Sequence, residues 1–275
     1  MLVFLGMEKQ LAVQDIFIYP IKSLGGIRLM ESEVEERGFR YDRRWMLVDE
    51  EGMFVTQRVY PQLALLGVKL GEGGLEVFHK TDPSKCIEVS FDLATGPEVM
   101  VTIWDDQVLA KAVHSDFDRW FSEFLDFKVR LVVLPETSHR KVDPRYAVNG
   151  ESVSFADGMP YLIIGQESLN ELNSRLDSPV PMDRFRPNIV FSGGAPYLED
   201  SLREIKIGGL GFKIVKPCAR CVLTTVDQQS GKQGKEPLKT LSSYRSVNNK
   251  VYFGQNVVAL SLGKIRIGDP IQIQK

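Results

Sequence analysis

Two cysteines and an arginine share the segment Lys216-Pro217-Cys218-Ala219-Arg220-Cys221, and Thr224 and Thr225 follow closely. A thiolate is a soft metal ligand and a strong nucleophile, and a neighbouring cation lowers its pKa and holds it ionised. Arg220 is the cation that the sequence places beside the thiols. The spacing of Cys218 and Cys221 leaves three interpretations open: a redox dithiol, half of a zinc site, or one functional thiol with a bystander.

The rest of the chain disfavours the first two interpretations. Structural zinc needs four ligands, but Cys86 is the one other cysteine, and the three histidines are far apart in the sequence. A thioredoxin-like dithiol belongs between a strand and a helix, whereas residues 204–215 predict a hairpin and residues 222–226 another strand. Two half-buried cysteines in a barrel remain the plain alternative. Arg220 argues against it, because a charge between two core thiols needs a reason.

Composition indicates an ordinary globular protein of one large or two small domains. Of 275 residues, 43% are hydrophobic and 25% charged, and the net charge of −2 gives no signal for nucleic acid or a membrane surface. No apolar run approaches the roughly 20 residues that span a bilayer. Residues 1–9 lack a basic leader and a cleavage site, so no signal peptide is expected. Three cysteines, an odd number, indicate a reducing compartment, and we expect a cytoplasmic protein.

Strand patterns dominate the chain and predict an α+β, mainly β fold built as a barrel or sandwich. Short strands are expected at 14–19, 63–66, 75–78, 86–91 and 99–104, with a hairpin over 45–56. Two helices are expected. Ser115-Asp116 should cap the first, which carries an aromatic stripe to Phe124, and the second should cover 166–176. A charged, Pro-containing loop over 136–145 follows a domain boundary that we place near residue 130.

Three basic clusters lie elsewhere, at 19–26, 40–45 and 182–190. Each alone is typical of a solvated turn or a surface ion pair. The first holds Lys22, Ser23 and a glycine pair but lacks the P-loop spacing. Together with Arg220, the clusters predict one anionic pocket, because arginine forks suit phosphate and planar heterocycles. Asn188 would offer both donors and an acceptor to the edge of such a ring.

At these residues the chain resembles the MOSC family, named for the C-terminal domain of molybdenum cofactor sulfurase. The nearest branch is that of the amidoxime-reducing components and bacterial N-hydroxylated-base reductases. The resemblance implies an N-terminal MOSC β-barrel domain over 11–130 and a MOSC domain over 131–273. The segments that carry it are residues 19–23, 42–48, 104, 155–160, 170–176, 185–190, 220–227, 236–241, 253–256 and 267–270.

The resemblance also implies a molybdenum cofactor between the two domains. The family's metal thiolate precedes an x-x-Thr-Thr run, which makes Cys221 the metal ligand and catalytic thiol and Cys218 the bystander. Asp157 matches an acid facing the metal cavity, and we expect it to handle protons. The positions that match pterin- and phosphate-binding residues are Lys22, Ser23, Arg43, Arg186, Asn188 and Arg220. The general family term pyridoxal phosphate binding accompanies the resemblance.

The implied activity is a molybdenum-dependent oxidoreductase that reduces N-hydroxylated bases, hydroxylamines or amidoximes. Three cysteines are too few for an iron–sulfur cluster held by four thiolates, so electrons are expected from a separate ferredoxin-, flavodoxin- or cytochrome-type protein. Two alternatives stay open. Cys221 could carry a persulfide or deliver the cofactor to a client, or the chain could be a non-catalytic binding module. Neither a membrane span nor a nucleic-acid partner is expected.

Overall fold

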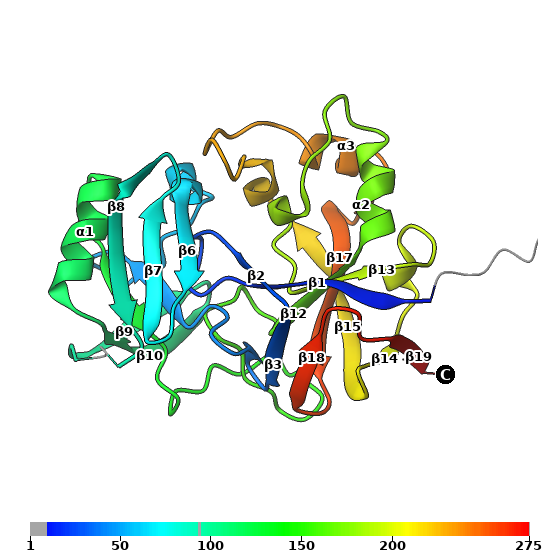
Figure 1. Ribbon diagram of the computed structural model, residues 1–275, viewed down its shortest axis with the longest axis horizontal. Coiled ribbons are helices and arrows are strands. Elements are labelled where there is room, and N and C mark those ends of the chain that lie inside the picture. Colours follow the sequence, from blue (N-terminus) through cyan, green and yellow to red (C-terminus); the bar gives the residue numbers. More distant parts are fainter. Residues whose placement is uncertain (1–9, 93–94, 275) are drawn as a thin grey trace, which may run out of the picture.

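A computed structural model describes residues 10–92 and 95–274, so the expectation about residues 1–9 lies outside the described residues. Two lobes lie side by side, and the chain crosses between them more than once (Figure 1). Strands dominate, with three α-helices in the described ranges, which confirms the predicted α+β, mainly β class. Within those ranges, no helix combines the length and the apolar character that crossing a bilayer requires.

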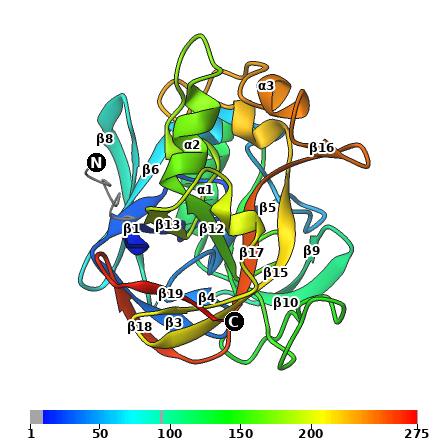
Figure 2. The ribbon, with the colours of Figure 1, turned by 90° about the vertical axis from the view of Figure 1, so that its right-hand side faces the viewer.

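Nine strands of the described chain form the largest sheet, in the order β19-β14-β15-β17-β12-β13-β1-β2, with β16 paired to β17. The strands are β1 (Ala12–Ile18), β2 (Ile27–Leu29), β12 (Tyr161–Gly165), β13 (Ile189–Ser192), β14 (Glu204–Ile207), β15 (Leu210–Arg220), β16 (Ser246–Val247), β17 (Lys250–Ala259) and β19 (Ile271–Gln274). β12 and β13 run parallel, which requires a crossover. Helix α2 (Gln166–Asn173) provides it and packs on both strands (Figure 2).

Three smaller sheets complete the two lobes. One has the order β5-β11-β10-β9, one β18-β3-β4 and one β6-β7-β8. Their strands are β3 (Glu31–Glu35), β4 (Gly38–Phe39), β5 (Trp45–Val48), β6 (Leu66–Leu70), β7 (Gly74–His79), β8 (Asp82–Ser90), β9 (Glu98–Ile103), β10 (Asp106–Ala112), β11 (Arg130–Val133) and β18 (Gly263–Arg266). Because β1 pairs with β13 and β18 with β3, the two ends of the chain build shared sheets. The division at residue 130 stays a prediction.

Two hydrophobic cores flank the seam between the lobes. Ile16 and Ile18 of β1 belong to the core of the largest sheet. Ile21 and Leu24, only a few residues later, belong to the core around α1 (Ser115–Leu125). All four side chains are fully buried, and each buried side chain of this size contributes about 1.5–3 kcal/mol. The chain is therefore anchored on both sides, and the short segment between the anchors is fixed at the seam.

Several expected elements form and others do not. The hairpin over 204–215 is present as β14 and β15. The strand expected at 63–66 was wrong. Pro61 begins a 3-10 helix there, η1 (Pro61–Leu65), since its fixed φ suits a first helical position. Helix α1 forms, but His114 is its N-cap and accepts from the Asp116 amide, in place of Ser115-Asp116. Helix α2 ends at Asn173, short of residue 176.

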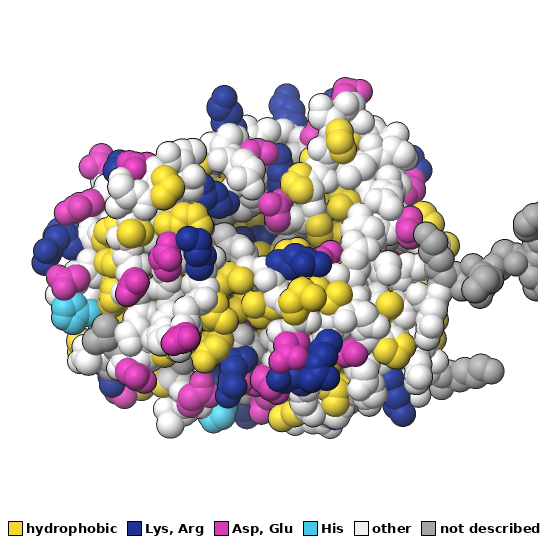
Figure 3. All heavy atoms as spheres, viewed as in Figure 1, with side chains coloured by type: hydrophobic (Ala, Val, Ile, Leu, Met, Phe, Trp, Pro, Cys, Tyr) yellow, Lys and Arg dark blue, Asp and Glu magenta, His cyan; other side chains and the backbone are white. Residues whose placement is uncertain are grey.

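Three further short helices were not expected from the sequence. Helix α3 (Leu238–Ser242) is one short turn, too brief to show a helical period. The 3-10 helices η2 (Met182–Arg184) and η3 (Leu198–Asp200) are shorter still. The space-filling view shows positive and negative side chains interspersed over one face, with a hollow between the lobes (Figure 3). Charge is therefore not gathered into one broad field on that face.

Candidate functional site

All eight residues singled out from the sequence line one pocket at the seam. They are Lys22, Ser23, Arg43, Asp157, Arg186, Asn188, Arg220 and Cys221. The pocket is open to solvent, and its empty space amounts to about 800 Å³ with the mouth included. Five lysines and arginines face one carboxylate across it. The roles of these residues stay predictions, but the pocket is strongly cationic.

Tight turns present three of these side chains. Ser23, Arg43 and Arg186 have φ values of 70°, 49° and 54°, in the left-handed region that a residue with a Cβ rarely adopts. Each such residue costs about 1–3 kcal/mol and persists where the surrounding structure enforces it. The buried anchors on either side of Lys22 and Ser23 supply that constraint in the first turn. Strained backbone thus gathers where the cations converge.

Cys221 lies half-buried at the end of β15, where it is the N-cap of η4 (Val222–Thr225). Its carbonyl accepts from the Thr224 amide at 3.1 Å and from the Thr224 hydroxyl at 3.0 Å. The Thr225 hydroxyl likewise donates to the carbonyl of Val222. The strand expected over 222–226 was therefore wrong. These hydroxyls bond locally to the backbone and compete with a sheet ladder.

The Arg220 guanidinium group donates no hydrogen bond to Cys221 Sγ. Its Nη1 donates to Cys218 Sγ at 2.8 Å and its Nη2 donates to the Phe185 carbonyl. Alternate residues of a strand share a face, so Arg220 meets Cys218, while Cys221 is directed elsewhere. β15 also carries bulges at 214–216 and 217–219, and bulges re-aim nearby side chains. The expectation that Arg220 is the cation of the functional thiol was wrong.

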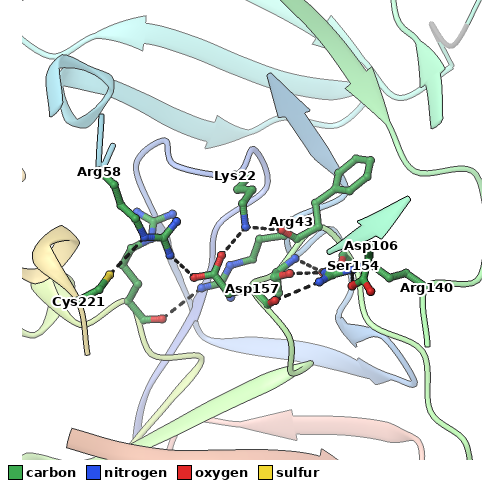
Figure 4. Close-up of polar contacts among 11 residues, drawn as sticks. Lys22, Arg43, Arg58, Asp106, Arg140, Ser154, Asp157 and Cys221 are labelled. Carbon is green, nitrogen blue, oxygen red and sulfur yellow. Dashed lines mark hydrogen bonds and ion pairs between the residues drawn. The ribbon is translucent and has the colours of Figure 1, made fainter. Parts of the chain in front are cut away.

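Arg58 takes that place. Its Nε donates to Cys221 Sγ at 3.3 Å, and its Nη2 pairs with Asp157 Oδ2 (Figure 4). Burial lowers the pKa of Arg58, but Asp157 and Cys221 outweigh it and leave the pKa above its usual value. Arg58 is 163 residues from Cys221 in the chain, and it carries no local motif. Sequence reasoning missed it for that reason.

Asp157 lies between two cations. Lys22 Nζ is 2.7 Å from Asp157 Oδ1 and also donates to the Phe155 carbonyl at 2.7 Å (Figure 4). Desolvation in the pocket raises the pKa of Asp157, but Lys22 and Arg58 outweigh it and hold the pKa well below its usual range. Burial lowers the pKa of Lys22 to about 8, against the opposing effect of Asp157. Asp157 is thus a carboxylate at neutral pH.

Arg140 fixes the loop that carries Asp157. It is almost fully buried, and its guanidinium donates to the carbonyls of Ser154, Ala156 and Asp157 while pairing with Asp106 at 2.7 Å. Figure 4 shows it on the side of Asp157 away from Cys221. The sequence showed only a charged loop here. No pattern in the sequence indicated that Arg140 of this loop is buried.

Arg43, Arg186 and Asn188 form the opposite wall. Arg43 Nη1 contacts Asp42 Oδ2 at 2.6 Å and Asn188 Oδ1 at 3.2 Å. Arg43 and Arg186 both lie over the ring of Tyr19, at 4.3 and 4.1 Å from its centroid. The Asn188 amide is buried and already bonds Leu162 and Phe17. It therefore holds the wall together and has little left to offer a ligand.

Two family models match the chain in sequence order. The MOSC N-terminal beta barrel domain matches residues 10–128, and the MOSC domain matches residues 150–272. Mitochondrial amidoxime-reducing component 1 of Mus musculus is 35% identical, over 95% of this chain and 82% of its own length. Mitochondrial amidoxime reducing component 2 of Homo sapiens is 32% identical, over 94% and 82%.

Molybdenum cofactor sulfurase of Oryza sativa is also similar, at 32% identity over 88% of this chain, which spans only 32% of the rice protein. These names connect the chain with molybdenum cofactor proteins and with an oxidoreductase activity. They lend no support to pyridoxal phosphate binding. The amidoxime-reducing relatives are named as mitochondrial, and the cytoplasmic location of this chain stays a prediction.

Proposed function

The chain belongs to the MOSC family, and on this premise we propose that it is a molybdenum-cofactor-dependent reductase of N-hydroxylated substrates. The observation that carries the proposal is the convergence of two half-buried thiols and five cations on one pocket. A thiolate suits a soft metal, and guanidinium groups suit phosphate and a planar heterocycle. When bound, the cofactor supplies two-electron oxygen-atom transfer, a chemistry that no side chain provides.

The donor set fits such a group. Arg220 Nε is buried and has no hydrogen-bond partner among the described residues, so a ligand acceptor could satisfy it. Across the described ranges, no three His, Cys, Asp or Glu side chains gather to hold a metal. Cys218 and Cys221 both line the pocket, but Cys218 Sγ already accepts a hydrogen bond from Arg220, so we assign Cys221 as the metal ligand. The remaining ligands would come from the cofactor. Lys22, Arg43, Arg186 and Arg220 would hold its anionic and polar edges.

We assign the proton-handling role to Lys22, with Asp157 as its partner. Reduction breaks the N–O bond of the substrate, takes up two electrons and two protons, and releases the amine and water. A proton donor works best with a pKa near the operating pH. Asp157 is ionised there, so it orients Lys22 Nζ through the 2.7 Å contact and does not itself store the proton. This assignment replaces Asp157 as the expected proton donor.

A separate redox protein is the proposed electron source, because the sequence has neither a cluster-forming cysteine set nor a dinucleotide fingerprint. The test is to express the chain in a host that makes the cofactor and to measure molybdenum and pterin per chain. An amidoxime is then offered with a chemical reductant. Stoichiometric metal with turnover supports the reductase. Metal without turnover supports the cofactor carrier, and the absence of both metal and turnover supports a non-catalytic binding module.

A further inference from the structure

Three contacts hold the guanidinium group of Arg58. Its Nε reaches Cys221 Sγ at 3.3 Å, its Nη2 pairs with Asp157, and its Cζ lies 4.8 Å from the ring centroid of Trp104. The Arg58 side chain is 16% exposed. Since arginine loses rotamer freedom when it is fixed in this way, three simultaneous contacts mark a position with a defined orientation.

Trp104 covers Arg58 and has a strained backbone conformation. It sits at the turn between β9 and β10 with φ of 54°, in the left-handed region that is unfavourable for a bulky residue. The residue is 47% exposed, yet its ring packs on that of Phe54 with the ring centroids 5.1 Å apart. Trp104 does not line the pocket itself. It stacks on the arginine that does, so its influence on the pocket passes through Arg58.

We propose that Arg58 tunes the reduction potential of the metal bound to Cys221, and that Trp104 is the positioning residue that holds Arg58 for this task. The inference rests on the proposed molybdenum function. Hydrogen bonds to a ligating sulfur, and charge near it, tune the potential of the metal. A cationic donor withdraws electron density from the sulfur and stabilises the more electron-rich, reduced metal. Arg58 therefore raises the potential, and its loss lowers it.

The two arginines near the thiols bond different sulfur atoms. Arg220 donates to Cys218 and to the Phe185 carbonyl, so it acts on the neighbouring sulfur. Arg58 is, within the described part of the chain, the side chain with a hydrogen bond to Cys221 Sγ. Of these two arginines, Arg58 is therefore the one whose substitution should change the metal potential through the ligand sulfur.

The experiment compares wild type with Arg58→Met, Arg58→Lys, Trp104→Ala and Trp104→Phe, all purified from a cofactor-competent host. Molybdenum per chain and thermal unfolding are measured first. The midpoint potential of the metal is then measured by titration with dithionite and mediators. Arg58→Met should shift the oxidised-to-reduced ratio tenfold at a fixed potential, which is about 30 mV more negative for a two-electron couple. Arg58→Lys and Trp104→Ala should shift it less, and Trp104→Phe should restore the wild-type value.

Arg145→Met is the matched control. Arg145 also pairs with an aspartate, Asp143, and lies over an aromatic ring, Tyr146, but outside the pocket lining. The midpoint potential of the metal in Arg145→Met should equal that of wild type. A folded, metal-containing Arg58→Met with an unchanged potential would overturn the inference. If that variant fails to load, equal potentials in Trp104→Ala and Trp104→Phe would overturn it. A wild-type chain without molybdenum would instead refute the proposed function.

Discussion

Replacing Lys22 with methionine should change how the free energy of unfolding depends on pH. Lys22 is 5% exposed, and burial lowers its pKa to about 8, against the opposing effect of Asp157. In the unfolded chain the pKa returns to its ordinary value of 10.5. Between these two values the unfolded chain binds more protons than the folded chain. The stability of wild type must therefore rise with pH across this window.

The magnitude follows from the difference between the two pKa values. One pKa unit corresponds to about 1.4 kcal/mol. Between about pH 7.5 and about pH 10, wild type should gain roughly 2 kcal/mol relative to Lys22→Met, which lacks the titrating group. Groups that titrate alike in both proteins cancel in this difference. Lys22→Arg is the control, since its guanidinium stays charged throughout, and wild type should gain on it by the same amount.

Urea unfolding of the cofactor-free proteins at the two pH values measures the effect. If the free energy of unfolding of wild type rises with pH relative to both Lys22→Met and Lys22→Arg, the rise comes from the buried Lys22. A difference between wild type and Lys22→Met that stays constant with pH would refute the reasoning, because it would mean that the Lys22 pKa is not lowered in the folded chain. An anion bound in the pocket favours the charged form of Lys22, so the gain should shrink in the cofactor-loaded protein.

Three further predictions concern the site. Cys221→Ser should abolish amidoxime reduction driven by a reduced viologen, while Cys218→Ser keeps most of it, because a serine oxygen is a harder donor with a far higher pKa; equal loss would favour a dithiol. Arg186→Ala should lower cofactor affinity by about one to two decades, the worth of a charge-assisted contact, and a folded variant with full molybdenum content would contradict this. Arg186 is also buried and donates to the Leu24 carbonyl, so its thermal stability should fall as well. The purified chain should not oxidise NADH by itself, measured by absorbance, and direct oxidation would reveal a nicotinamide site that the sequence does not show.

The sequence by itself determined the strand-rich class, helix α1 and the hairpin of β14 and β15. Alternating or helical periods, with turn residues between them, are local signals that survive in the fold. The motifs were equally readable, and all eight predicted residues line one pocket. Their types predicted a cationic site around a thiol, because residue chemistry does not depend on where the chain folds.

The tertiary structure decided which of these side chains meet. Lys22 and Asp157 are 135 residues apart, and Arg58 is 163 residues from Cys221. Nothing local in the sequence links such pairs. Arg220 illustrates the reverse case, since it neighbours Cys221 in the chain but bonds Cys218. The direction of each side chain follows from strand alternation, from the bulges in β15 and from the two cores that clamp the seam. These depend on packing across the whole chain, which no local pattern encodes.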